Sequence, residues 1–228
     1  MWLIKSRRWL RPENIRGNCF KIDGMNVEIE NIVFDFGGVL IDLDFERLLN
    51  AFKKIGFNDI ETQLKTYERD GIFQKYELGE MTADEFRMAI RGKSNVILTD
   101  SDIDDLWNLM LVHIPSEKLD FILNLRNNYN VYLLSNTNSI HWEYACKNSF
   151  CYKEYNIKDF FIKTFLSYEM HLAKPDKAIY ESMLNQAKLI PEKTLFIDDS
   201  LANCNVAKQL GINVHHYQIG ENLETVLT

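Results

Sequence analysis

The chain has 228 residues, and 46% of them are hydrophobic, so it can bury the core of one large domain or two small ones. Its formal net charge of -7 at pH 7 argues against a nucleic-acid-binding protein, which usually carries a basic surface. No apolar run approaches the ~18 residues that a membrane span needs, and no secretory signal is recognisable. We therefore expect a cytoplasmic protein with reduced cysteines and neither a nucleic acid nor a membrane as its partner. No pattern predicts an oligomeric state.

The first part of the chain is predicted to be a tail. Its basic cluster, "KSRRWLRP", is followed by residues without a clear period, and Met25 stands just before "NVEIENIVFDF", where a globular domain would naturally begin. We therefore expect residues 1–24 to be poorly ordered and without function.

From residue 25 onward, apolar strands alternate with amphipathic helices. The strands run apolar without alternation, as strands buried on both faces do. In chain order, the predicted elements after the first strand "NIVFD" are "SEKLDFILNLRNNY" (a helix with Ser116 as its N-cap), "NVYLLSN", "SIHWEYACKNSF", "IKTFLS", "PDKAIYESMLNQAKL", "KTLFIDDS", "LANCNVAKQLG" and "INVHHYQ". Strands separated by helices predict an α/β fold with a doubly wound, Rossmann-like parallel sheet.

Residues 43–114 interrupt this alternation. They contain helical stripes such as "FERLLNAFKKIG" and "TADEFRMAIRG" and no convincing strand. The sequence therefore predicts an all-helical domain over residues 43–114, inserted into a core that comprises residues 25–42 and 115–228.

Polar side chains follow the predicted strands, at the sheet edge where open α/β sheets bind their ligands. They are Asp35 after the first strand, Ser135, Asn136 and Thr137 after the second, Lys174 just past the third, and Asp198 and Asp199 after the fourth. Three converging carboxylates repel one another unless a cation neutralises them, and hard oxygen ligands suit Mg²⁺. Hydroxyl, amide and lysine groups beside them are donors to phosphoryl oxygens, and an aspartate there can form an aspartyl-phosphate.

The segments that carry these residues resemble a known family. "FDFGGVLID", "YLLSNTN", "AKPD" and "LFIDDSLANCNVAKQLG" are similar, in this order, to the four motifs of the haloacid dehalogenase-like (HAD) hydrolases, over about residues 29–220. The inserted helices resemble the cap of the C1 subclass IA, and "YELGEMTADEF" and "LLSNTNSIHWEY" resemble the branch that contains glucose-1-phosphate phosphatase. The resemblance implies a Mg²⁺-dependent phosphatase that acts on a small phosphorylated metabolite, such as a sugar phosphate.

Carried over by motif position, the resemblance implies a nucleophile and a metal site. Asp35 would attack phosphorus, and Asp35, Asp199 and the backbone carbonyl of Gly37 would bind Mg²⁺. Asp198 and Asn203 would support the metal from the last motif.

The resemblance also implies a phosphate site. Ser135 and the backbone of Asn136 would hold the phosphoryl group, and Lys174 would neutralise the nucleophile and the developing charge.

The sequence departs from the family pattern at Gly37. Most phosphatases of the family have an aspartate there, which protonates the leaving oxygen, and such acid–base work is worth about 10²–10⁴-fold. Three interpretations follow. The substrate has an easily expelled leaving group; another group supplies the proton, with Asp42, Asp44 and Glu80 as candidates; or the chain is a weak or inactive relative that binds or regulates.

Two further points stay open in the sequence. A metal-free 2-haloacid dehalogenase would also lack that aspartate, but "DDS" at residues 198–200 would then be an uncompensated acidic pair. The insert turn at Gly79 is expected to face the nucleophile, with Arg69, Tyr76 and Glu80 as candidate substrate contacts. His141 either faces the cleft or packs between helices.

Overall fold

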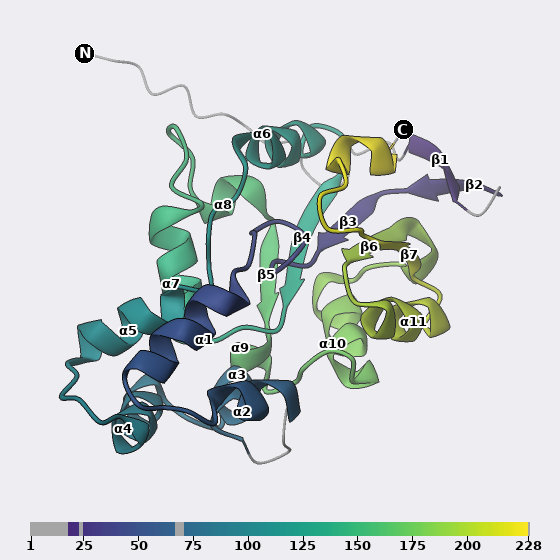
Figure 1. The fold of residues 1–228 in the computed structure, drawn as a ribbon. Coiled ribbons are helices and arrows are strands. Elements are labelled where there is room, and N and C mark those ends of the chain that lie inside the picture. Colours follow the sequence, from purple (N-terminus) through teal and green to yellow (C-terminus); the bar gives the residue numbers. More distant parts are fainter. Residues whose placement is uncertain (1–17, 23–24, 67–70, 228) are drawn as a thin grey trace.

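The computed structural model describes residues 18–22, 25–66 and 71–227, and a five-stranded parallel sheet lies at its centre (Figure 1). The strand order is β5-β4-β3-β6-β7, so the chain builds outward from β3 first to one side and then to the other. The strands are β3 (Asn31–Phe34), β4 (Asn130–Ser135), β5 (Lys163–Leu166), β6 (Thr194–Asp198) and β7 (Asn213–His216). This arrangement confirms the predicted doubly wound α/β fold.

Helices cover both faces of the sheet, which explains why its strands are apolar without alternation. Ile32 and Phe34 of β3 belong to one buried cluster, and Val33, between them, belongs to another. The first cluster packs against α6 (Ser116–Leu125), α7 (Ser139–Asn148) and α8 (Ile157–Phe160), and the second against α10 (Lys177–Ala187) and α11 (Leu201–Gln209). The short elements α9 (Ser167–Met170), η2 (Pro191–Lys193) and η3 (Leu223–Leu227) complete the described elements of this part of the chain.

Between β3 and α6, the described residues form five helices around a hydrophobic cluster of their own, and we call these helices the cap. They are α1 (Phe45–Lys54), α2 (Ile60–Thr66), α3 (Ile72–Glu77), α4 (Ala83–Lys93) and α5 (Asp100–Asn108). Aromatic side chains fill this cluster, for example Phe73 stacked on Trp107 with ring centroids 5.1 Å apart. The cap lies beside the sheet, and β5 leads through α9 toward α3 (Figure 1).

Two segments, residues 42–44 and 110–113, join the cap to the sheet, and we call them the connector. They pair with each other: the Asp42 amide donates to the His113 carbonyl at 3.0 Å, and Leu43 forms an antiparallel bridge with Leu111. Asp44 then begins α1 as its N-cap, accepting a hydrogen bond from the Arg47 amide at 2.9 Å.

The structure differs from the sequence prediction near the N-terminus. β1 (Asn18–Ile22) pairs antiparallel with β2 (Met25–Ile29), so part of the predicted tail is a strand. Pairing with β1 satisfies backbone groups of the segment that enters the sheet. The rest of the predicted tail lies outside the described residues. In addition, Pro115 rather than Ser116 is the N-cap of α6. None of the described helices is long and apolar enough to cross a membrane.

Candidate active site

A buried lysine lies between two aspartates at the carboxyl ends of adjacent strands. Phe34 of β3 pairs with Ile197 of β6, so the residues that follow them, Asp35 and Asp198, lie side by side. Lys174 Nζ lies 2.7 Å from an oxygen of each carboxylate. All three side chains are buried. This point is also where the strand order reverses, the place where doubly wound sheets bind their ligands.

The charges in this cluster shift one another's pKa. Burial and the charge of Asp198 raise the pKa of Asp35, while the charge of Lys174 lowers it. The net result is a pKa of about 7. For Lys174, burial lowers the pKa, but the charges of Asp35 and Asp198 outweigh burial and raise it overall. One lysine therefore compensates an acidic cluster only in part.

A third carboxylate completes a group that fits a metal ion. Oxygen atoms of Asp35, Asp198 and Asp199 all lie within 4.8 Å of one another. Burial and then the charge of Asp198 raise the pKa of Asp199, so a cation here would relieve both the repulsion and the desolvation. Gly38, at φ +76°, makes room for this carboxylate, because a Cβ there would lie 2.3 Å from Asp199 Oδ2. A set of carboxylate oxygens without nitrogen or sulfur ligands suits Mg²⁺.

The loop after β6 holds Asp198 in place. Asn203 Nδ2 lies 3.0 and 3.1 Å from the two Asp198 oxygens, and the Ser200 amide donates to Asp198 Oδ1 at 2.8 Å. Ser200 also begins α11 as its N-cap. The structure thus brings Asn203 to the acidic cluster through Asp198.

Ser135 and Asn136 lie at the end of β4, beside this cluster. The Ser135 hydroxyl is buried and lies 3.2 Å from the Asn136 carbonyl. The Asn136 side chain pairs with the backbone of Lys174: its Oδ1 accepts from the Lys174 amide at 2.8 Å, and its Nδ2 donates to the Lys174 carbonyl at 2.9 Å. Sequence reasoning considered only the backbone of Asn136 and missed this clamp, because no local pattern reveals a contact across 38 residues.

A leucine covers the position at which the family usually has its second aspartate. A Cβ added at Gly37 would lie 3.1 Å from Leu43 Cδ1, so a side chain there would require the Leu43 side chain to shift by a few tenths of an ångström. Two of the three alternative acids suggested by the sequence have partners at the connector. Asp42 has its oxygens 3.8 Å from His113 Nδ1 and 3.9 Å from Lys118 Nζ, and Asp44 caps α1.

The structure favours the packing interpretation of His141. Its ring stacks on Trp107 of the cap with centroids 4.6 Å apart, and only 3% of the residue is exposed. His141 Nε2 lies 3.1 Å from the Trp107 carbonyl, and Asn138 contacts His141 Nδ1 at 3.2 Å and Trp107 Nε1 at 3.2 Å. Burial lowers the pKa of His141 to about 4, so the ring is neutral near pH 7.

The candidate substrate contacts of the cap have different surroundings. Tyr76 is buried and its hydroxyl contacts Ser139 Oγ at 2.8 Å and the Ile140 amide at 3.1 Å, so it joins the cap to α7. Glu80 is exposed, and Arg69 lies outside the described residues. Sequence reasoning missed Ser167, which contacts the cap. Applying the strand-end rule to β5 would have identified it.

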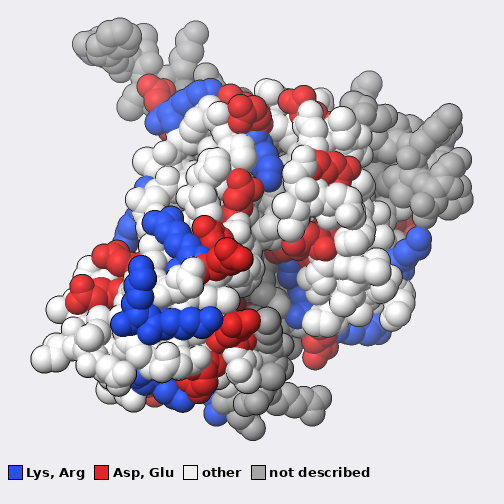
Figure 2. All heavy atoms as spheres, viewed as in Figure 1, with Lys and Arg blue, Asp and Glu red and all other residues white. Residues whose placement is uncertain are grey.

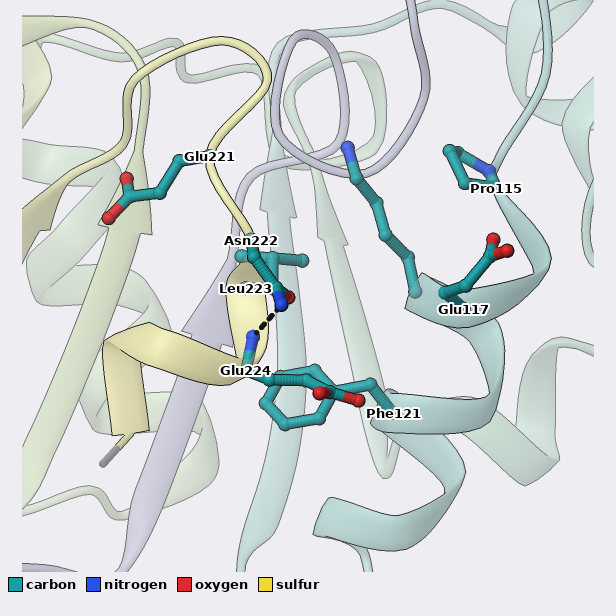
Figure 3. Close-up of a pocket in the computed structure, with 8 residues that line it drawn as sticks. Pro115, Glu117, Phe121, Glu221, Asn222, Leu223 and Glu224 are labelled. Carbon is teal, nitrogen blue, oxygen red and sulfur yellow. Dashed lines mark hydrogen bonds between the residues drawn. The ribbon is translucent and has the colours of Figure 1, made fainter.

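A cavity in the described part of the chain lies elsewhere. It measures about 260 Å³ and lies between α6 and the C-terminal η3, with Phe121 and Leu223 among its lining residues (Figure 3). Lys118, at its wall, is already bonded to the Val39 carbonyl. On the face shown in Figure 2, basic side chains of the cap lie next to acidic ones, so the described part of that face carries no continuous basic surface.

Comparison with known proteins defines the family to which the chain belongs. The haloacid dehalogenase-like hydrolase family matches residues 29–211, most of the chain, and the chain therefore belongs to this family of hydrolases. This confirms the resemblance seen in the four motifs; the glucose-1-phosphate branch stays a prediction.

Particular relatives come from two bacteria. A D-ribitol-5-phosphate phosphatase from Bacteroides thetaiotaomicron is 38% identical over 200 residues, covering 88% of this chain and 97% of the relative. A HAD family enzyme from the same organism, solved with magnesium and inorganic phosphate, is 47% identical, with a TM-score of 0.84 over 88% of this chain and all of that one. A HAD-like hydrolase structure from Porphyromonas gingivalis is 37% identical, with a TM-score of 0.80 over 87% and 96%.

Proposed function

We propose that this protein is a Mg²⁺-dependent phosphatase that hydrolyses a small phosphorylated metabolite, a sugar phosphate or the phosphate of a related polyol. The observation that carries the proposal is the cluster in which one lysine lies between two buried aspartates, with a third carboxylate within 4.8 Å. Such an excess of negative charge calls for a cation, and a cation beside lysine attracts a phosphoryl group. The relatives named above include a phosphatase and an enzyme solved with magnesium and phosphate.

Asp35 acts as the nucleophile in this proposal. A carboxylate oxygen of Asp35 forms a bond to phosphorus while the bond from phosphorus to the leaving oxygen breaks, which gives an aspartyl-phosphate. Water then attacks this phosphorus, releases inorganic phosphate and returns the Asp35 carboxylate. Lys174, 2.7 Å from Asp35 Oδ1, keeps the nucleophile oriented and balances the charge that develops on the phosphoryl oxygens.

Asp35, Asp199 and the backbone carbonyl of Gly37 would hold the Mg²⁺. When bound, the ion orients the phosphoryl group and offsets its charge. Asp198 holds Lys174, and Asn203 holds Asp198, so these two residues support the site without needing to touch the substrate.

Ser135 and the Asn136 backbone bind the phosphoryl oxygens in this proposal. Both lie at the end of β4, and the Asn136 side chain fixes the Lys174 backbone to the same strand end. The donors around the phosphoryl group therefore come from one preorganised unit, which is how enzymes stabilise developing charge at low reorganisation cost.

A second candidate follows from Gly37, which supplies no acid for the leaving oxygen. The chain could then bind a phosphorylated ligand with weak or no turnover. A metal-free dehalogenase is disfavoured, because it would leave the acidic group formed by Asp35, Asp198 and Asp199 without a cation.

One assay separates these functions. Phosphate release is measured on D-ribitol 5-phosphate, glucose 1-phosphate, acetyl phosphate and other small phosphate esters, first with Mg²⁺ and then with EDTA. We expect release that requires Mg²⁺. No release from any ester by folded protein that still binds Mg²⁺ and phosphate in calorimetry would favour the binding protein, and EDTA-resistant halide release from 2-haloacids would favour the dehalogenase.

A further inference from the structure

The cap turn, residues 77–79, lies against a short segment of the core that no motif includes. This segment is α9 with its C-cap, His171, directly after β5. Ser167 is fully buried, and its hydroxyl lies 2.6 Å from the Glu77 carbonyl and 3.0 Å from the Thr137 carbonyl. The same oxygen accepts a hydrogen bond from the Thr137 amide at 2.9 Å. Ser167 thus joins the cap turn to the strand end of β4.

His171 makes the next contact, with the following residue of the cap turn. Its Nδ1 lies 2.9 Å from the Leu78 carbonyl, so Nδ1 carries the hydrogen and donates it. His171 has φ 53°, in the left-handed region that is unfavourable for a residue with a Cβ. A glycine would remove this cost but would also remove the hydrogen bond to the cap.

Gly79 extends the contact along the cap turn. Its φ is +67°, and a Cβ there would lie 2.1 Å from the Tyr168 carbonyl. The two backbones therefore approach as closely as the absence of a side chain permits. Three consecutive residues of the cap turn meet the α9 segment: Glu77 and Leu78 through hydrogen bonds and Gly79 through direct packing.

The α9 segment also reaches both loops of the candidate active site. Thr137, which Ser167 holds, directly follows Asn136, whose backbone is proposed to bind the phosphoryl group. His171 lies three residues before Lys174 in the same loop, and Asn136 clamps that loop at Lys174. One short segment therefore sets the position of the cap turn relative to the phosphate-binding groups.

We propose that Ser167 and His171 are positioning residues that fix the cap turn relative to the proposed phosphate-binding groups and thereby select the leaving group. This inference rests on the proposed phosphatase function. A substrate whose leaving group is long enough to reach the cap turn depends on this position. A substrate with a very small leaving group does not.

His171→Gly is the main test, because glycine relieves the left-handed strain while it removes the imidazole, with its hydrogen bond to Leu78 and its packing against Gly79. We expect kcat/KM for D-ribitol 5-phosphate to fall about 10-fold, the equivalent of one hydrogen bond, mainly through KM. The kcat/KM for acetyl phosphate should stay within about twofold of the wild-type value. His171→Asn should restore selectivity, since asparagine tolerates the left-handed region and its amide can donate.

A matched control is available in Lys188, which also has a left-handed φ, of 54°, but ends α10 at an exposed position. Lys188→Gly should change neither substrate's kcat/KM. Equal losses on both substrates in His171→Gly, or no loss on either, would overturn the inference.

A second readout does not depend on turnover. Amide hydrogen exchange in residues 77–80 should be faster in His171→Gly and in Ser167→Ala than in the wild-type chain, and unchanged in Lys188→Gly. Unchanged exchange in the two cap-facing variants would refute the positioning role even if the protein proves to be a phosphatase. Faster exchange in a chain that hydrolyses no phosphate ester would refute the phosphatase proposal, and with it the selection of a leaving group, but leave the contact itself established.

Discussion

Two buried polar clusters in this protein contrast in charge. Asp35, Lys174 and Asp198 are buried at the strand ends with more negative than positive charge. Trp107, Asn138 and His141 are equally buried where α5 meets α7, but every group in that network is neutral and the hydrogen bonds close on themselves.

The contrast separates a site that can react from a junction that holds two parts together. The neutral junction has its donors and acceptors matched within the protein, so it gains nothing from a ligand. The charged cluster is only partly compensated, and it gains from a cation. Burial alone therefore does not mark function, whereas buried charge without full compensation does.

The largest effect is expected from Asp35→Asn, which removes the proposed nucleophile and keeps its shape. Phosphate release should fall by about 10³-fold or more, because a group that forms the covalent intermediate has no substitute. The folded structure should persist, since Lys174 keeps Asp198 as its partner. Circular dichroism melting is the control, and a variant that keeps a tenth of its activity would show that Asp35 is not the nucleophile.

Lys174→Met should damage both stability and activity. Removing one partner of a buried ion pair typically costs about 3–5 kcal/mol, because it leaves buried carboxylates without their counter-charge. Lys193→Met is the matched control, since the ion pair between Lys193 and Glu30 is partly exposed and solvent screens it. Urea unfolding measures the free energy of unfolding of both variants. Equal losses of stability would show that Lys174 does not compensate buried charge.

The neutral junction should respond to acid. His141 has a pKa of about 4 in the folded state and an ordinary value of 6.5. Between these two pH values the imidazole is protonated in the unfolded chain but not in the folded chain. The neutral His141 therefore contributes fully to the free energy of unfolding above pH 6.5. This contribution is lost as the pH falls toward 4, by up to about 3 kcal/mol. Urea unfolding between pH 7 and 4 measures it. His141→Phe should flatten the dependence of stability on pH in this range. An unchanged dependence in His141→Phe would contradict this view of the junction.

The smallest effects are expected at the connector. Asp44→Ala removes the N-cap of α1 and should cost about 1 kcal/mol, while the rate stays within about twofold. Asp42→Asn should alter stability even less, because its carboxylate is half exposed. A rate loss of about 100-fold in either variant, at unchanged folding, would instead identify the missing proton donor.

Strand-end residues were predictable from the sequence because parallel strands bring their carboxyl ends to one edge. This rule brings Asp35 and Asp198 together without any knowledge of the loops, whereas Lys174 reaches them from the loop that follows α9. The order of strands and helices along the chain was predictable for a different reason. Each element has its own hydrophobic pattern, as the buried residues of β3 and β4 illustrate.

Contacts between the cap and the core were not predictable. His171 contacts Leu78, which lies 93 positions away in the sequence. A histidine does not by itself indicate a left-handed backbone, so the φ of 53° could not be predicted either. Asn138 and His141 are close in sequence, but only Trp107 from a distant helix decides that they are buried. The strand β1 was missed because residues 18–22 show no apolar run like that of the core strands.

Leu43 links the missing acid to the joint between the cap and the core. It covers the space beside Gly37, and it also forms the bridge with Leu111 that pairs the two connector segments. An acidic side chain at position 37 would press its Cβ against Leu43 Cδ1 at 3.1 Å, so the Leu43 side chain would have to shift by a few tenths of an ångström. Because the same residue packs on Gly37 and pairs the two connector segments, a substitution at position 37 would act on the joint between the cap and the core as well as on the site.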